Sequence, residues 1–127
     1  MNRTILEILE KTADKFPDKV IYEDINREST YKEFVETSKK IGTALAKQIQ
    51  NINKPIAIYI DRSVTCLETM MGVTYSGNYF TVLDIKSPKE RIDKIINSLP
   101  DISIIVEKKN IEKLKEFNFN GKIFIYE

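Results

Sequence analysis

The 127-residue chain contains no histidine. Histidine is the usual general base, the residue that activates a serine or cysteine nucleophile, and the commonest metal ligand in proteins. Its absence therefore excludes the Ser-His and Cys-His arrangements on which most hydrolases depend.

Glycine is also scarce. The chain has only Gly42, Gly72, Gly77 and Gly121. No two of them have the spacing of a dinucleotide fingerprint or of a Walker loop, in which backbone amides surround the phosphates. We therefore do not expect a nucleotide site that is complete within this chain.

The chain also has little cysteine and little net charge. Cys66 is the only cysteine, so the chain has no internal disulfide and a cytoplasmic location is the default expectation. The first fifteen residues are charged and lack the apolar run of a secretory signal or a membrane span. The net charge is +1, with both signs interleaved, so we expect neither nucleic acid nor a membrane as a partner.

The N-terminal part of the chain has the pattern of two helices and a hairpin. Residues 4–16 carry apolar side chains at helical spacing. Residues 20–23 are typical of a strand, and Asn26 favours a turn that leads into a hairpin. Thr30 and Glu33 have the spacing of a capping box, which predicts that a long helix begins there.

From Pro55 onward, short apolar strands alternate with helical patterns. Their lack of polar alternation is expected for parallel strands covered on both faces. The strands are predicted at residues 56–60, 79–83, 102–106 and 122–126. The helical patterns between them end at Gly77, at Pro100 and before Gly121. This alternation predicts the α/β class, with a mostly parallel, doubly wound sheet and flanking helices.

The length of the chain is that of one domain. No low-complexity linker interrupts it. We therefore expect a single domain over residues 1–127, with an N-terminal helix and hairpin region at 1–54 and parallel βα units at 55–127.

Acidic residues follow the four predicted strands. They are Asp61, Asp84, Glu107 and Glu127. Ligands bind at the carboxyl edge of an open parallel sheet, so these acids can be interpreted as a magnesium or phosphoryl-transfer site. The alternative is that each acid caps the next helix or meets water, and we favour this structural interpretation. We accordingly predict no catalytic, cofactor-binding, substrate-binding or metal-binding residue in the chain.

Cys66 occupies the third position of a helix that Ser63 is predicted to cap. A helix N-terminus can activate a thiol, which makes Cys66 a candidate nucleophile. Because no histidine and no second cysteine are available to support that chemistry, we interpret Cys66 as a small buried apolar residue.

The stretch LDIKSPKERI contains a strand-to-helix junction. Ser87 is predicted to cap the helix, with Pro88 at the first helical position and Glu90 returning the capping hydrogen bond. Asp84, at the strand exit, is predicted to form an Asx turn and to pair with Arg91. This assembly fixes the junction and requires no substrate.

Three segments of the chain have the order and spacing of known motifs. They are STYKEF (29–34), IDRS (60–63) and SGNYFTVLDIKSPKERI (76–92). They resemble the beginning of an amino-acid-activating adenylation domain, of the kind found in nonribosomal peptide synthetases and D-alanyl carrier protein ligases. STYKEF is similar to that family's LTYxEL motif, and Gly77, Phe80, Leu83 and Asp84 match LKAGxAYxPLD.

The resemblance continues after the aspartate. Pro88 and Arg91 match the family's YPxxR, at a distance more similar to the amino-acid-activating branch than to the fatty-acyl or luciferase branches. The chain departs from the family pattern at Tyr75, Ser76 and Val82, where the family has a lysine, a small residue and a proline. These departures change no group known to act on substrate.

The resemblance implies that the chain is the N-terminal fragment of an adenylate-forming enzyme, here called the parent. In such enzymes a phosphate loop resembling TSGTTGxPK, the amino-acid pocket, the ribose-binding aspartate and the catalytic lysine all come later. The parent is implied to use ATP and Mg to form an aminoacyl adenylate and to pass the aminoacyl group to a carrier-protein thiol. The fragment itself is expected to be inactive, to hold no cofactor and to pack against the rest of the adenylation domain.

Two other classes of protein remain open at this point. A small receiver-like signalling domain is also an α/β sheet of this length with acids at its carboxyl edge. It should carry an adjacent acid pair after its first buried strand, where this chain has Asp61 and Arg62. A noncatalytic interaction module would bind a partner without any nucleotide.

Overall fold

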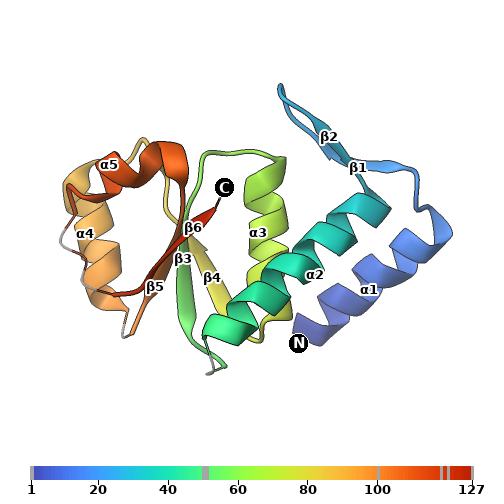
Figure 1. Cartoon of the computed structure of the whole chain (residues 1–127), viewed down its shortest axis with the longest axis horizontal. Helices are drawn as coiled ribbons and strands as arrows, with labels where there is room; N and C mark the ends of the chain where they lie inside the picture. Colours follow the sequence, from blue (N-terminus) through green and yellow to red (C-terminus); the bar gives the residue numbers. More distant parts are fainter. Residues whose placement is uncertain (1, 50–51, 100, 118, 120, 127) are drawn as a thin grey trace. The chain divides into compact units, whose positions relative to one another are not determined.

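A computed structural model describes residues 2–49, 52–99, 101–117, 119 and 121–126. The chain divides into two compact units. The helical unit comprises Met1–Ile52 and Arg62–Gly77, and the sheet unit comprises Asn53–Asp61 and Asn78–Glu127. Figure 1 labels the helices and strands of each unit.

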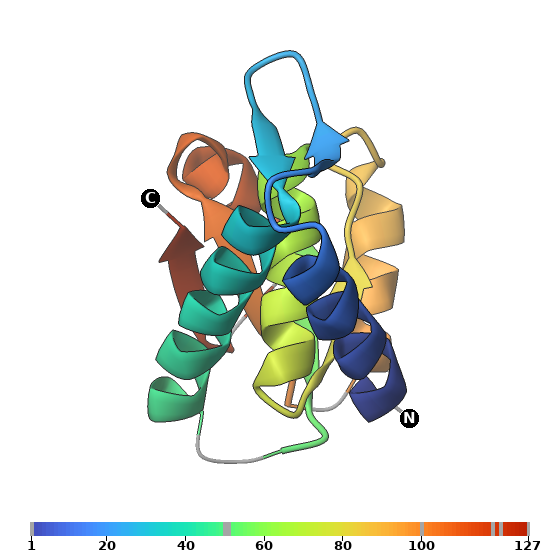
Figure 2. The same ribbon diagram turned by 90° about the vertical axis from the view of Figure 1, so that its right-hand side faces the viewer.

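The described part of the helical unit consists of helices and one β-hairpin. The helices are α1 (Asn2–Lys15), α2 (Tyr31–Gln48) and α3 (Val64–Tyr75). The hairpin pairs β1 (Val20–Glu23) antiparallel with β2 (Glu28–Thr30). Figure 2 shows α2 and α3 side by side, with the hairpin loop at one end of the helices. The two predicted N-terminal helices and the predicted hairpin are confirmed.

Local sequence determines where these helices begin and end. The Thr30 hydroxyl accepts the Glu33 N–H at 3.2 Å, and the Glu33 carboxylate accepts the Thr30 N–H at 2.9 Å, which confirms the capping box. Ser63 Oγ accepts the Cys66 N–H at 3.1 Å, so Ser63 caps α3 as predicted. Cys66 is buried, also as predicted. Gly77 has a φ of +85°, the left-handed conformation in which a helix commonly ends.

The backbones of α2 and α3 approach each other closely at two glycines. A Cβ atom on Gly42 would lie 2.7 Å from Tyr75 Cβ, and one on Gly72 would lie 2.6 Å from Ile41 Cβ. Neither position has room for a side chain, so the absence of Cβ is what allows this close approach. The core of the helical unit therefore depends on two of the four glycines.

α1 buries less of its apolar face than its helical spacing predicts. Ala13 is buried, whereas Ile5 and Ile8 are 54% and 61% exposed. Phe16, which follows the helix, is also exposed. The amphipathic helix is present, but much of its apolar face is not covered within the described residues.

The sheet unit is built on four parallel strands in the order β4-β3-β5-β6. Their bounds are β3 (Pro55–Tyr59), β4 (Tyr79–Val82), β5 (Ser103–Glu107) and β6 (Ile123–Tyr126). The register places Ala57 beside both Thr81 and Ile104. The chain passes from β3 to β4 on one side and then to β5 and β6 on the other, as in a doubly wound sheet. The predicted strands and the predicted α/β class with a mostly parallel sheet are confirmed.

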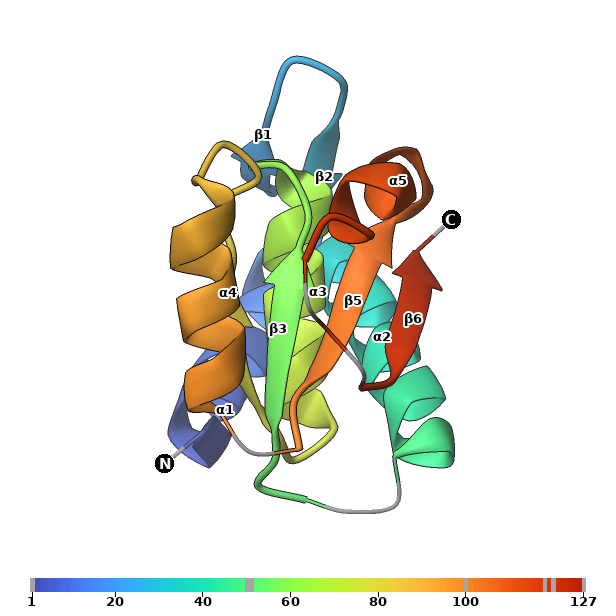
Figure 3. The ribbon, with the colours of Figure 1, turned by 90° about the vertical axis from the view of Figure 1, so that its left-hand side faces the viewer.

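Two helices cover one face of this sheet (Figure 3). They are α4 (Lys89–Ser98) and the short α5 (Ile111–Leu114), which follows the 3₁₀ turn η1 (Lys108–Asn110). Tyr59, Val106, Ile92 and Phe117 meet in the core between them. α5 is shorter than the predicted helix because Phe117 N–H bonds to the Leu114 carbonyl three residues earlier, which tightens the last turn. None of the described helices is both long and apolar enough to span a membrane.

Burial differs between the central and the edge strands. All five residues of β3 are buried, as predicted. The edge strands β4 and β6 instead expose large apolar side chains, namely Tyr79, Val82, Ile123 and Ile125. The prediction of full coverage is therefore wrong for these two strands, because an apolar sequence does not reveal whether other elements cover both faces of a strand.

Candidate functional site at the carboxyl edge of the sheet

The strand-end acids of the sheet unit lie at one edge of the sheet. Glu107 ends β5, Asp61 follows β3, and Asp84 follows β4. Because these strands are parallel and adjacent, their carboxyl ends point the same way, as the arrowheads of β3 and β5 show in Figure 3. Glu127 lies outside the described residues.

The Glu107 carboxylate bonds to the segments that follow two neighbouring strands. Its Oε1 atom accepts the Asp61 N–H at 3.0 Å and a side-chain N–H of Asn110 at 3.4 Å. Asp61 follows the central strand, and Asn110 lies in the turn after β5. Glu107 therefore fastens the end of β3 to the turn that follows the neighbouring strand.

Asp84 organises the turn after β4. Its Oδ1 atom accepts the Lys86 N–H at 2.9 Å, and its carbonyl oxygen accepts the Ser87 N–H at 3.0 Å. The predicted Asx turn is thus confirmed. The predicted Ser87 cap is wrong, since the N-cap of α4 is Pro88 and no side chain bonds to the end of the helix. The turn closed by Asp84 holds Ser87 one residue ahead of the cap position.

A lysine, not the predicted arginine, contacts this junction. Lys113 Nζ donates to the Ile85 carbonyl oxygen and so connects α5 to the segment between β4 and α4. Arg91 is exposed in the first turn of α4. Both Arg91 and Asp84 are described, and no ion pair joins them, so that predicted pair is wrong.

Tyr59 is the titratable side chain buried beneath this edge. Its ring packs edge-on against Phe117, with the ring centroids 5.7 Å apart, and its hydroxyl has no hydrogen-bonding partner among the described residues. Burial raises the pKa of Tyr59, and the negative charges of Glu116 and Asp84 raise it further. The phenol therefore stays protonated at neutral pH and does not supply a base.

The geometry of the edge favours the structural interpretation of its acids. Within the described ranges, no group of three or more acidic or cysteine side chains is arranged to hold a metal ion. The carboxylates of Glu107 and Asp84 instead accept hydrogen bonds from the backbone and from a neighbouring amide. These bonds fix where the strands end and where the next segments begin.

An Asp84→Ala variant should lower the free energy of unfolding by about 1 kcal/mol, because it removes the acceptor that closes the Asx turn. Asp84→Asn is the matched control, since the amide oxygen can accept the same Lys86 N–H. Urea unfolding of both variants measures the difference. If Asp84→Asn lowers stability as much as Asp84→Ala does, the Asx turn is not how Asp84 stabilises the fold.

The helical unit contains a polar cluster that was not predicted from the sequence. The Arg27 guanidinium, in the hairpin turn, donates to the Glu68 carboxylate and, at 3.1 Å, to Thr65 Oγ1, both on α3. The Glu68 side chain is only 2% exposed, whereas that of Arg27 is 41% exposed. A buried carboxylate is thus neutralised by an arginine that reaches it from the hairpin.

Asp24 makes the second connection between the hairpin and α3. Its Oδ2 atom accepts the Val64 N–H at 2.8 Å, and its Oδ1 atom accepts the Asn26 and Arg27 N–H groups at 2.7 and 2.9 Å. These amides, Val64 first, hold the pKa of Asp24 below its usual range. The stabilisation is present above the unfolded pKa, near 3.8, and is lost as the pH falls through the lower folded pKa. We call Asp24, Arg27, Thr65 and Glu68 the hairpin latch.

One signal in the sequence could have indicated the latch. Glu68 interrupts the apolar pattern of α3, and a buried acid requires a partner. The partner lies 41 residues earlier in the chain. Spacing along the sequence cannot identify a pair at that distance.

Known proteins are similar to nearly the whole chain. The family model described as AMP-binding enzyme matches residues 9–123. A D-alanine–D-alanyl carrier protein ligase from Listeria monocytogenes serovar 1/2a is 33% identical, and the match covers 75% of this chain and 19% of the ligase. Tyrocidine synthase 1 from Brevibacillus parabrevis is 20% identical, and the match covers 97% of this chain and 11% of the synthase. The chain thus spans less than a quarter of these two relatives.

Solved structures share the fold. The N-terminal subdomain of NpsA from Klebsiella oxytoca superposes with a TM-score of 0.82 at 18% identity, over 95% of this chain and 30% of that one. VinN superposes with a TM-score of 0.83 at 16% identity, over 94% of this chain and 32% of that one. The arrangement of helices and strands in this chain is therefore also present in about a third of each of these two structures.

Proposed function

Because the chain belongs to the AMP-binding enzyme family, we propose that it is the N-terminal scaffold of an ATP-dependent ligase that activates an amino acid. The observation that carries the proposal is the family match over residues 9–123. The names of similar proteins, a D-alanine–D-alanyl carrier protein ligase and a nonribosomal peptide synthetase among them, favour the amino-acid-activating branch.

The proposed reaction of the parent has two steps. The amino-acid carboxylate attacks the α-phosphate of ATP and releases pyrophosphate, which leaves an aminoacyl adenylate. The thiol of a carrier protein then attacks the aminoacyl carbonyl, so that a thioester forms and AMP leaves. Mg would neutralise the phosphate charges in the first step.

The contribution of this chain is architectural. Asp84 and Glu107 fix the ends of parallel strands, and the hairpin latch neutralises a buried acid. We do not assign the Mg-ATP site to the described residues, because the Glu107 and Asp84 carboxylates at the sheet edge accept backbone N–H groups and no cluster suited to a metal ion occurs among those residues. Catalytic groups would be supplied by the rest of the parent.

The two alternative classes of protein, a receiver-like domain and a noncatalytic interaction module, differ in the support that they receive. The family match gives no support to a receiver-like signalling domain. A noncatalytic interaction module built on the same fold is still compatible with the strand-end geometry. Activity of the parent distinguishes it from a ligase, since such a module would bind a partner but would form no adenylate.

The test is amino-acid-dependent exchange of labelled pyrophosphate into ATP by the purified parent. A panel of amino acids that includes D-alanine is compared with fatty acids and with a blank that lacks any acid. We expect exchange well above the blank with one amino acid or a small related group. Exchange with none of the panel would contradict a ligase, and exchange with fatty acids alone would contradict the amino-acid branch.

A further inference from the structure

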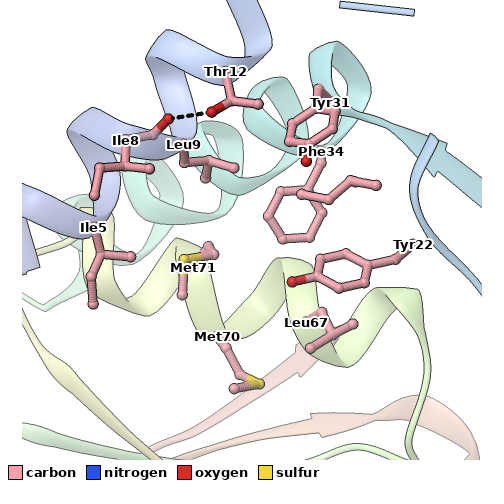
Figure 4. A pocket seen from close by; sticks show the side chains of 11 residues that line it. Ile5, Ile8, Leu9, Thr12, Tyr22, Tyr31, Phe34, Leu67, Met70 and Met71 are labelled. Carbon is pink, nitrogen blue, oxygen red and sulfur yellow. Dashed lines mark hydrogen bonds between the residues drawn. The ribbon is translucent and has the colours of Figure 1, made fainter. Parts of the chain in front are cut away.

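The helical unit contains a pocket of about 330 Å³ that none of the strand-end acids reaches. Side chains from α1, the hairpin, α2 and α3 line it, as Figure 4 shows. A volume of this size is at the lower end of the range for small-molecule sites. The pocket is therefore large enough for a ring or a short branched chain.

None of the described residues that line the pocket has a charged side chain. It consists of aliphatic, aromatic and methionine residues with a few hydroxyl groups, and Ile5, Leu9, Phe34 and Leu67 are typical members. Burying a charge without a partner in such surroundings is costly. An occupant of this pocket should therefore be uncharged.

Among the lining residues that the structure describes, hydroxyl groups supply the side-chain hydrogen-bonding atoms. The Thr12 hydroxyl already donates to the Ile8 carbonyl oxygen at 2.9 Å. The Tyr22 and Tyr31 hydroxyls have no hydrogen-bonding partner among the described residues. In Figure 4 the Tyr22 hydroxyl points toward the methionines of α3. Tyr22 is thus placed to bond one polar group on an otherwise apolar molecule.

One wall of the pocket is held in place and another can adapt. The Tyr22 ring packs against Phe34 at 5.3 Å, and the hairpin that carries it is fastened to α3 by the latch. Met70 and Met71 line the opposite side, and unbranched methionine side chains adjust readily to the shape of a ligand. A fixed aromatic wall facing an adjustable one is suited to binding a flat ring.

The α1 side of the pocket has apolar surface that is still exposed. Ile5 and Ile8 both line the pocket and remain more than half exposed. A molecule seated against them would remove this surface from water, which is the main source of binding free energy for an apolar ligand.

From these features we propose that the pocket binds a small uncharged molecule with an aromatic ring and one hydroxyl group, a phenol being the simplest example. This site is separate from the proposed activation of an amino acid and does not rest on it. The Tyr22 hydroxyl bonds the ligand hydroxyl, Phe34 and Tyr22 contact the ring, and Met70 and Met71 close around it.

The test uses the 127-residue chain labelled with ¹³C at its methionine methyl groups. The chain has three methionines, of which Met70 and Met71 line the pocket and Met1 does not. Titration with p-cresol should shift the Met70 and Met71 signals saturably, with a dissociation constant of about 1 mM for a molecule of this size. 4-Methylbenzoate, which has the same ring but a negative charge, should produce no saturable shift.

Two variants and one control variant test whether p-cresol binds in this pocket. Tyr22→Phe should weaken p-cresol about fivefold and leave toluene unaffected, because only p-cresol uses the hydroxyl. Ile8→Glu should abolish binding, whereas Ile25→Glu, at a fully exposed residue that does not line the pocket, should not.

Three results would overturn the proposal. The first is the absence of a saturable shift up to about 10 mM p-cresol, a concentration well above the dissociation constant expected for so small a molecule. The second is equal binding of p-cresol and 4-methylbenzoate. The third is unchanged binding of p-cresol by the Ile8→Glu variant. Since the readout is binding to this chain alone, it is unaffected by whether the parent activates an amino acid.

Discussion

An Arg27→Ala variant is expected to lose about 3 kcal/mol of unfolding free energy. The change removes the guanidinium that donates to Glu68, whose side chain is 2% exposed. Removing one partner of a buried pair leaves the other charge without compensation, and that cost exceeds the net value of the pair itself. The partial exposure of Arg27 places the estimate at the low end of the range for buried pairs.

Chemical denaturation of two further variants identifies the cause of this loss. Glu68→Gln in the Arg27→Ala background should recover much of the stability, because a neutral amide costs less to bury than a carboxylate. Lys39→Ala is the matched control, since Lys39 pairs with Glu10 at 3.1 Å on an exposed surface and should lose less than about 1 kcal/mol. If Arg27→Ala costs no more than Lys39→Ala, the latch does not stabilise the fold.

A Gly72→Ala variant should lose about 2 kcal/mol, even though alanine is the better helix former. The new Cβ would lie 2.6 Å from Ile41 Cβ and 3.2 Å from the Ser38 carbonyl oxygen. Ile41 Cβ is attached directly to the backbone of α2, so relief requires the helices to move apart and not merely a change of rotamer. The packing cost should therefore exceed the helix propensity gained.

Thermal or urea unfolding measures this effect against two controls. Thr43→Ala, at an exposed position of α2, changes helix propensity without changing the contact and should be neutral or slightly stabilising. Combining Gly72→Ala with Ile41→Gly should cost less than the sum of the two single changes, because glycine at position 41 removes the Cβ atom that the new methyl group would meet. A Gly72→Ala variant as stable as the natural chain would show that the helices can separate freely.

Local features of the fold followed from the sequence because neighbouring residues determine them. The Thr30 and Glu33 capping box, the Ser63 cap and the helix end at Gly77 each depend on groups within one turn of the helix. The four apolar strands were likewise predictable from short continuous runs. The Asp84 turn belongs to the same class, because its carboxylate bonds an amide two residues away.

Features that depend on distant residues did not follow from the sequence. Glu68 meets an arginine 41 residues away, and Glu107 meets the Asp61 amide 46 residues away. The exposure of Ile8 on α1 likewise depends on what packs beside it, which its periodicity does not specify. The predicted Ser87 cap is absent for a local reason. The Ser87 N–H bonds to the Asp84 carbonyl oxygen, so Ser87 belongs to that turn and precedes the N-cap residue, Pro88.

We propose that this chain is the scaffold of an amino-acid-activating ligase and carries no catalytic group. The most direct test compares pyrophosphate exchange by the parent and by residues 1–127 alone, at equal concentration and with the amino acid that the parent prefers. Circular dichroism first verifies that the short chain is folded. We expect exchange by the parent and none above the enzyme-free blank by the chain. Reproducible amino-acid-dependent exchange by residues 1–127 alone would contradict the account.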